Sequence, residues 1–137
     1  YLGGASSVQN SYYTNPLPGW RLNQGLHGWN GVDLGGHGVL GAPVLAAAAG
    51  TVIVARGSGW NGGYGNYVVI VHNNGTQTLY SHMRSVSVSP GESVLSGQGI
   101  GSVGSSGKST GAHLHFEVRG AANPFRTCSI GSVCSPK

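Results

Sequence analysis

Two histidines occupy alternate positions in the segment His113-Leu114-His115-Phe116-Glu117-Val118-Arg119. Successive side chains of a β-strand point to opposite faces, so both imidazoles, Glu117 and Arg119 would share one face. The apolar residues between them would face a core. Two imidazoles on one face can both bind a metal ion, or one can bind it while the other transfers protons. The alternative is a half-buried strand whose two histidines have no chemical role.

Few other residues of this chain could ligate a metal. It has six histidines but only three acidic residues, Asp33, Glu92 and Glu117. Asp33, the only aspartate, lies shortly after His27, and another histidine, His82, follows Tyr80-Ser81. A catalytic zinc site typically takes three His, Asp or Glu ligands and leaves one position for water. The sequence therefore contains the parts of such a site, with histidines to spare.

Length and composition indicate the kind of domain that must position these residues. A chain of 137 residues suits one domain with a single modest core. Glycine accounts for 26 residues and charged residues for only 7% of the chain. The usual share of glycine is about 7%. Abundant Gly, Ser, Thr, Asn and Val favour short strands joined by tight turns over a helical or disordered chain.

Charge bears on the partners of the protein. Seven Lys and Arg against three acidic residues give a formal charge of +4, which favours anionic surroundings such as an acidic cell-wall polymer. The basic residues are dispersed, so we expect no nucleic-acid partner. We expect a monomer. The chain begins without Met or a signal peptide, as a mature or trimmed fragment would.

One uncharged stretch, residues 38–55, is a candidate membrane-spanning segment. Pro43 and Gly50 interrupt it, and Thr51-Val52-Ile53-Val54 is entirely β-branched. Two short buried strands around a turn at Gly50 explain this pattern better than a spanning helix. We therefore expect no transmembrane segment.

Strand signals recur along the rest of the chain, and no segment shows a 3.6-residue period. Residues 1–20 read as an irregular segment. Asn73-Asn74-Gly75-Thr76 predicts a hairpin turn, and Gly-rich loops lie at 57–65 and 104–111. We predict an all-β fold, a compact antiparallel sheet with sheet-on-sheet or barrel-sandwich packing and long Gly-rich loops. The expected strands are 44–47, 51–56, 67–72, 77–83, 86–88, 100–103 and 112–119.

The two cysteines, Cys128 and Cys134, lie near the end of the chain and far from the histidine motifs. A zinc knuckle needs a second pair, so a short disulfide loop in an oxidising compartment is the better interpretation. Closing so small a loop contributes roughly 2 kcal/mol in the entropy model. We expect this bond to pin the tail, residues 126–137, rather than to hold the fold.

The order of several motifs resembles the lysostaphin-type zinc metalloendopeptidases, peptidoglycan-cleaving enzymes that include the β-lytic proteases. The most specific motifs are Ser109-Thr110-Gly111-Ala112-His113-Leu114-His115-Phe116-Glu117 and Thr78-Leu79-Tyr80-Ser81-His82-Met83. Gly63-Tyr64-Gly65-Asn66-Tyr67-Val68-Val69-Ile70 and Gly50-Thr51-Val52 are weaker and support the fold only. The resemblance covers residues 20–125, and we place the catalytic domain at 21–125.

The resemblance implies a role for each matching residue. His27, Asp33 and His115 would bind one Zn²⁺ per chain, and His82 and His113 would flank the metal-bound water. The implied function is a secreted or cell-envelope zinc metalloendopeptidase that hydrolyses peptidoglycan cross-bridges or stem peptides by attack of a zinc-bound water. Either His82 or His113 could act as the general base.

The first ligand departs from the family pattern. The family usually has His-x-x-x-Asp, which would place the ligand at position 29, where this chain has Trp29. His27 can reach the metal if the chain bulges, and Gly28 and Gly31 would permit the bulge. His37 is the alternative ligand, or an exposed loop histidine. Trp29 should then point away from the metal and pack on a groove wall or the core.

Other assignments remain open from the sequence alone. Glu117 would orient a ligand histidine, or be a solvated strand residue paired with an arginine. Trp29, Trp60 and Tyr64 are candidate walls of a substrate groove, though each could serve packing. His72 at a strand end would be structural. A second class of function is a catalytically inactive module of the same fold that binds the wall or regulates another hydrolase.

Overall fold

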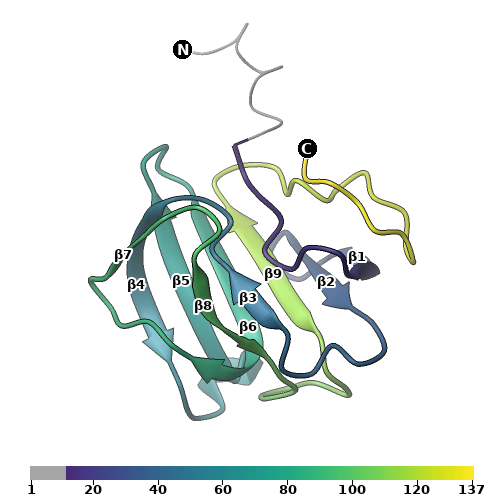
Figure 1. Cartoon of the computed structure of the whole chain (residues 1–137), viewed down its shortest axis with the longest axis horizontal. Coiled ribbons are helices and arrows are strands. Elements are labelled where there is room, and N and C mark those ends of the chain that lie inside the picture. Colours follow the sequence, from purple (N-terminus) through teal and green to yellow (C-terminus); the bar gives the residue numbers. More distant parts are fainter. Residues whose placement is uncertain (1–11) are drawn as a thin grey trace, which may run out of the picture.

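The structure, a computed structural model, describes residues 12–137 and is almost entirely β (Figure 1). The predicted all-β class is confirmed. Residues 12–20 of the segment expected to be irregular contain no strand, and residues 1–11 lie outside the described part. The strands are β1 Arg21–His27, β2 Gly31–Gly35, β3 Pro43–Leu45, β4 Gly50–Arg56, β5 Asn66–His72, β6 Gln77–Val86, β7 Ser93–Val94, β8 Gly99–Val103 and β9 Leu114–Arg119, with one short 3₁₀ turn, η2, at Asn61–Gly63.

All strands belong to one antiparallel sheet of order β1-β2-β9-β6-β5-β4-β7, and β3 and β8 form a ribbon attached to β6. In the view of Figure 1 this ribbon lies in front of β5 and β6. Apolar side chains of the ribbon and of β4, β5 and β6 belong to one buried cluster that includes Val44, Ile100, Val52, Ile70 and Tyr80. Packing is therefore achieved by one folded sheet, which does not close into a barrel.

The central strands follow the alternation expected from their sequences. In β9, Leu114, Phe116 and Val118 are buried in the apolar core. The Asn-Gly turn joins β5 to β6, and Gly75 adopts a positive φ of 85° there. The uncharged stretch contains two short strands, β3 and β4, as predicted, but the turn lies before Gly50, which is the first residue of β4. The described residues contain no helix that could span a membrane.

Four strand assignments differ from the sequence analysis. Strands β1 and β2 form although glycine and polar residues give them weak strand propensity, because each gains a hydrogen-bonded neighbour. The two-residue β7 was not predicted. The predicted strand 86–88 is wrong: β6 continues to Val86, and the chain then leaves the sheet.

Strand β6 changes partner in its middle. One edge pairs with β9 through Gln77–Ser81 and then with β8 from Met83 onward. His82 lies at this fork with a φ of 60°, a left-handed conformation that is uncommon for a residue other than glycine. Because β8 and β9 diverge here, the loop between them, residues 104–113, lies beside His82. The fork therefore positions the candidate site.

Candidate metal centre

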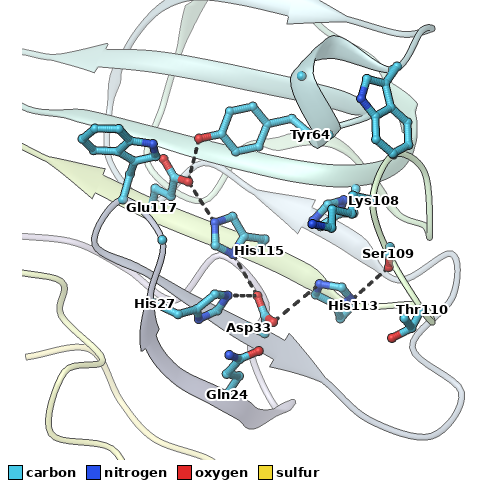
Figure 2. Close-up of a pocket in the computed structure, with 17 residues that line it drawn as sticks. Gln24, His27, Asp33, Tyr64, Lys108, Ser109, Thr110, His113, His115 and Glu117 are labelled. Carbon is cyan, nitrogen blue, oxygen red and sulfur yellow. Dashed lines mark hydrogen bonds and ion pairs between the residues drawn. The ribbon is translucent and has the colours of Figure 1, made fainter.

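Pairing between β2 and β9 brings the first two candidate ligands together. Asp33 lies directly opposite His115 in the register of these strands. His115 Nδ1 is 2.9 Å from Asp33 Oδ1, and both residues are buried (Figure 2). Strand pairing thus joins residues that are far apart in sequence.

His27 reaches the same point through an irregularity at the end of β1. The register of β1 against β2 shifts between Gln24 and His27, and Gly28 and Asn30 both have positive φ in the following turn. His27 Nε2 consequently lies 3.3 Å from Asp33 Oδ1. The Asn30 side chain holds this turn by donating to two backbone carbonyls, those of Val118 and Ala121, at 2.8 Å each.

Gly31 supplies the space for the His115 ring. A Cβ atom at Gly31 would lie 2.6 Å from His115 Cε1 and 3.0 Å from Glu117 Cγ. Any larger residue would force the ring to shift. Glycine is required here for the close approach rather than for its backbone freedom.

The ligand atoms of His27, Asp33 and His115 all lie within 4.8 Å of one another. His27 Nδ1 is 2.8 Å from the Gly25 carbonyl oxygen, which can only accept, so Nδ1 carries the hydrogen and Nε2 keeps a lone pair. Two imidazole nitrogens and one carboxylate are the donor set that catalytic zinc sites use. The residues present therefore fit a zinc ion.

His82 and His113 flank this group without belonging to it. His82 Nδ1 donates to the Ser106 carbonyl at 2.8 Å, and His113 Nδ1 donates to the Gly111 carbonyl at 2.9 Å. Each neutral ring therefore keeps an unprotonated Nε2. The two ring centroids are 4.9 Å apart, and His113 Nε2 is 3.6 Å from Asp33 Oδ2. Burial lowers the pKa of His82.

Glu117 is buried and accepts hydrogen bonds on both carboxylate oxygens. Its Oε2 lies 2.9 Å from His115 Nε2 and 2.8 Å from the Tyr64 hydroxyl (Figure 2). Its Oε1 lies 3.0 Å from Arg119 Nη2. Glu117 is only 1% exposed, so the interpretation as a solvated strand residue is wrong, although its arginine partner is present. Sequence could not settle this because Tyr64 comes from a distant loop.

The pKa values in this cluster are shifted by burial and by hydrogen bonds between its members. Burial lowers the pKa of His115, but hydrogen bonds to Asp33 and Glu117 outweigh it and raise that pKa to about 9. For Asp33 and Glu117, burial raises the pKa, but their partners lower it below the ordinary value. Burial and then Glu117 raise the pKa of Tyr64 to about 12, so Tyr64 remains a donor.

The centre opens into a cavity of about 880 Å³. All three predicted wall residues line it: Trp29, Trp60 and Tyr64. Trp29 is 73% exposed and Trp60 is 61% exposed, so both stand on the wall and neither belongs to the core. Other lining residues that the sequence analysis did not select are Gln24, Lys108, Ser109 and Thr110.

The two Gly-rich loops that carry these walls are fastened to each other. Lys108 N donates to the Gly63 carbonyl at 2.8 Å. A Cβ atom at Gly65 would lie 2.4 Å from the Ser106 carbonyl carbon, so the backbones touch. This contact lets the 57–65 loop border the cavity beside His82, whose N–H donates to the Tyr64 carbonyl at 2.9 Å.

The remaining histidines lie elsewhere. His37 is exposed in a turn after β2 and is not in the metal cluster. His72 is buried at the end of β5 and bonds to the Ala49 carbonyl and the Thr78 hydroxyl. Both positions agree with their structural interpretation.

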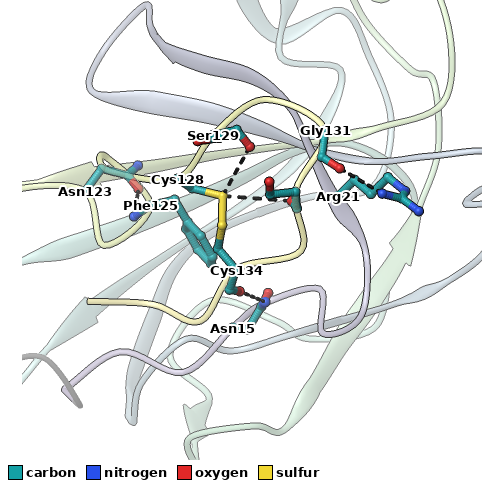
Figure 3. The surroundings of a disulfide bond; sticks show 9 residues. Asn15, Arg21, Asn123, Phe125, Cys128, Ser129, Gly131 and Cys134 are labelled. Carbon is teal, nitrogen blue, oxygen red and sulfur yellow. Dashed lines mark hydrogen bonds between the residues drawn. A yellow bond between two sulfur atoms is a disulfide. The ribbon is translucent and has the colours of Figure 1, made fainter.

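The two cysteines form the predicted disulfide, away from the metal centre (Figure 3). Around it the tail is bonded to the N-terminal part of the chain: Asn15 Nδ2 donates to the Cys134 carbonyl at 3.3 Å, and Arg21 Nη1 donates to the Gly131 carbonyl at 2.8 Å. The bond therefore fixes a tail that is itself packed on the domain.

The chain is similar to two curated bacterial proteins, a DD-carboxypeptidase/endopeptidase and a murein hydrolase activator. It is 42% identical over 133 residues to the DD-carboxypeptidase/endopeptidase Mpg of Neisseria meningitidis, covering 93% of this chain and 29% of Mpg. It is also 42% identical over 96 residues to the murein hydrolase activator EnvC of Escherichia coli, covering 70% of this chain and 22% of EnvC. The chain thus spans less than a third of either relative.

Solved structures show the same fold. The catalytic domain of lysostaphin from Staphylococcus simulans is 33% identical, with a TM-score of 0.59, over 82% of this chain and 83% of that domain. A zinc containing peptidase from Vibrio cholerae is 37% identical, with a TM-score of 0.59, over 78% of this chain and 32% of the other. The model of peptidase family M23 matches residues 27–127, which include all the residues of the centre. The chain belongs to peptidase family M23.

Proposed function

We propose that this protein is a zinc metalloendopeptidase that hydrolyses peptide bonds in bacterial peptidoglycan, in cross-bridges or stem peptides. The observation that carries the proposal is the complete constellation: three ligand groups, His27, Asp33 and His115, beside two histidines with a free Nε2. A chain that had lost activity would not need to retain all five.

Different residues would bind the metal and transfer protons. Zinc, when held by the three ligand groups, lowers the pKa of water towards 7 and polarises a carbonyl group. His113 and His82 each present an Nε2 lone pair that can accept the proton of the attacking water and return it to the leaving amine. Asp33 Oδ2 lies 3.6 Å from His113 Nε2, so a charge gained at His113 is next to a carboxylate.

The cavity supports an extended peptide as substrate. It is open, and its exposed tryptophans, Trp29 and Trp60, can cover the flanks of a chain of small residues. The net charge of +4 favours contact with an acidic envelope. A disulfide and cell-wall relatives support a place in the envelope or outside the cell.

The similarity to the activator EnvC supports a second candidate, a module that regulates another hydrolase without cleaving peptidoglycan itself. The intact ligand set favours the enzyme. The two functions predict different results in one experiment.

The purified chain is analysed for zinc and incubated with purified peptidoglycan and defined cross-linked muropeptides, and new amine and carboxyl ends are identified by mass spectrometry. The enzyme should hold one zinc per chain and release peptide products. His37→Ala, a change of an exposed histidine, serves as the control that keeps both properties. A zinc-loaded chain that cleaves no peptide but stimulates a separate wall hydrolase would establish the regulator instead.

A further inference from the structure

Glu117 is a fully buried carboxylate that is not one of the three ligand groups. It lies two residues after His115 on the same face of β9, and it is 1% exposed. Burying a charge is costly unless it is paired and hydrogen-bonded. Three donors, from His115, Tyr64 and Arg119, satisfy Glu117 here. So complete a set of partners calls for an explanation beyond packing.

The carboxylate determines which nitrogen of His115 can bind a metal. An ionised carboxylate only accepts hydrogen bonds, so the His115 Nε2 that lies 2.9 Å from it must carry a hydrogen. In the neutral ring the lone pair is then on Nδ1, the atom that faces Asp33. His27 has the opposite arrangement, because the Gly25 carbonyl fixes its hydrogen on Nδ1. Each ligand histidine is thus held with a different nitrogen toward the centre.

Packing confines the His115–Glu117 pair as well. The Cβ position of Gly31 is only 2.6 Å from the His115 ring and 3.0 Å from Glu117 Cγ, so β2 closes over both side chains. On the other side, Arg119 Nη2 lies 3.0 Å from Glu117 Oε1 and 3.2 Å from the Tyr64 hydroxyl. Tyr64 and Arg119 therefore hold the carboxylate while the carboxylate holds the ring.

We propose that Glu117 is a positioning residue for metal binding: clamped by Tyr64 and Arg119, it keeps His115 with Nε2 protonated and Nδ1 directed to the metal. This inference rests on the zinc site of the proposed function, but not on hydrolysis. Partners of this kind behind a ligand histidine typically change metal affinity by about 10- to 100-fold.

The test is the zinc affinity of Glu117→Gln, measured by competition with a chromogenic chelator in the absence of substrate. The change keeps the size of the side chain and removes its charge. We expect affinity to fall about 10- to 100-fold while circular dichroism remains that of the wild type. In the zinc-loaded wild type, NMR should show a His115 Nε2 proton protected from solvent exchange, and this protection should be reduced in the variant.

Glu92→Gln is the matched control, because Glu92 is exposed and accepts a hydrogen bond from the Ser89 N–H in a distant turn. Its zinc affinity should equal that of the wild type. A folded Glu117→Gln that binds zinc within twofold of the wild type, or an equal loss in Glu92→Gln, would overturn the proposal.

A second variant covers the case in which Glu117→Gln does not fold. Tyr64→Phe with Arg119→Gln leaves Glu117 in place but removes its two supports, and both altered residues are partly exposed. We expect a smaller, few-fold loss of zinc affinity and faster exchange of the Nε2 proton. Unchanged values for both would contradict the clamp. A wild-type chain that binds zinc but cleaves no peptidoglycan would refute the proposed hydrolysis and leave this inference intact.

Discussion

His115 and His72 are both buried on strands of the same sheet, with 6% and 4% exposure, and both ring nitrogens of each have partners. The pKa values of the two imidazoles are nevertheless shifted in opposite directions. Two carboxylates raise the pKa of His115 to about 9 despite its burial. Burial lowers the pKa of His72 below its ordinary value.

The difference lies in the charge of the neighbours, since burial is nearly the same. His72 Nδ1 donates to the Ala49 carbonyl at 2.9 Å, and Nε2 is 2.8 Å from the Thr78 hydroxyl. Thr78 in turn contacts the Tyr80 hydroxyl, which accepts from the Ala47 N–H. This chain of uncharged groups satisfies a neutral ring, whereas the neighbours of His115 favour a cation or a metal ion.

The largest effect should come from removing the charge between the ligand histidines. Asp33→Ala is expected to abolish both zinc retention and hydrolysis, because the described chain offers no other aspartate in its place. His72→Gln, at the uncharged site, should keep one zinc per chain. Zinc content and the release of peptide products are measured for both variants. Wild-type zinc occupancy in Asp33→Ala would show that this carboxylate is not a ligand.

Substitution of His27 tests whether the bulge of β1 places this residue as a metal ligand. His27→Ala should reduce zinc affinity about as much as His115→Ala, whereas His37→Ala should be nearly silent, since His37 is exposed and outside the cluster. Chelator competition on the three variants gives the comparison. If zinc affinity fell in His37→Ala but not in His27→Ala, His37 would be the ligand and His27 would not.

The two flanking histidines should separate metal binding from turnover. His113→Ala and His82→Ala are expected to keep zinc but to lose about 10²- to 10⁴-fold in hydrolysis, as for a general base. Steady-state rates and zinc content are measured on the same preparations. If His113→Ala lost the metal instead, the roles of His113 and His115 would be reversed.

The smallest effect should be a dependence of stability on pH at His72. Its folded pKa is below the unfolded value of 6.5, so the unfolded chain binds more protons as pH falls below 6.5. The free energy of unfolding should therefore fall below pH 6.5, by at most about 1.4 kcal/mol per pH unit for this group. Part of this slope should disappear in His72→Gln and persist in His37→Gln. Urea unfolding at several pH values measures this pH dependence. If the free energy of unfolding varied with pH equally in the wild type and both variants, His72 would not be its source.

The sequence predicted the central strands well and the flanking ones poorly. Alternating or β-branched runs locate β4, β5 and β9 to within two residues, because their side-chain pattern matches the pleat. Strands β1 and β2 lack such a pattern and are stabilised by their neighbours, yet they carry His27 and Asp33. Motif resemblance selected these two residues where propensity could not.

Three features of the site depend on contacts that no local pattern encodes. The reach of His27 depends on a register shift in β1, and the role of Glu117 depends on Tyr64, which arrives from the 57–65 loop. His82 likewise owes its orientation to the fork in β6, with a φ of 60° that a strand pattern does not predict. These features arise from tertiary pairing.

The disulfide loop has a consequence for association between molecules. Strand β1 ends the sheet order, and such an edge exposes N–H and C=O groups that can pair with a second molecule. Here Leu22 N donates to the Ser132 carbonyl at 2.9 Å, and Gly131 N donates to the Leu22 carbonyl at 2.7 Å, so the loop closed by Cys128 and Cys134 occupies the edge. The oxidised tail thereby acts as a cover against edge-to-edge aggregation, and reduction would loosen that cover on the strand that ends in His27.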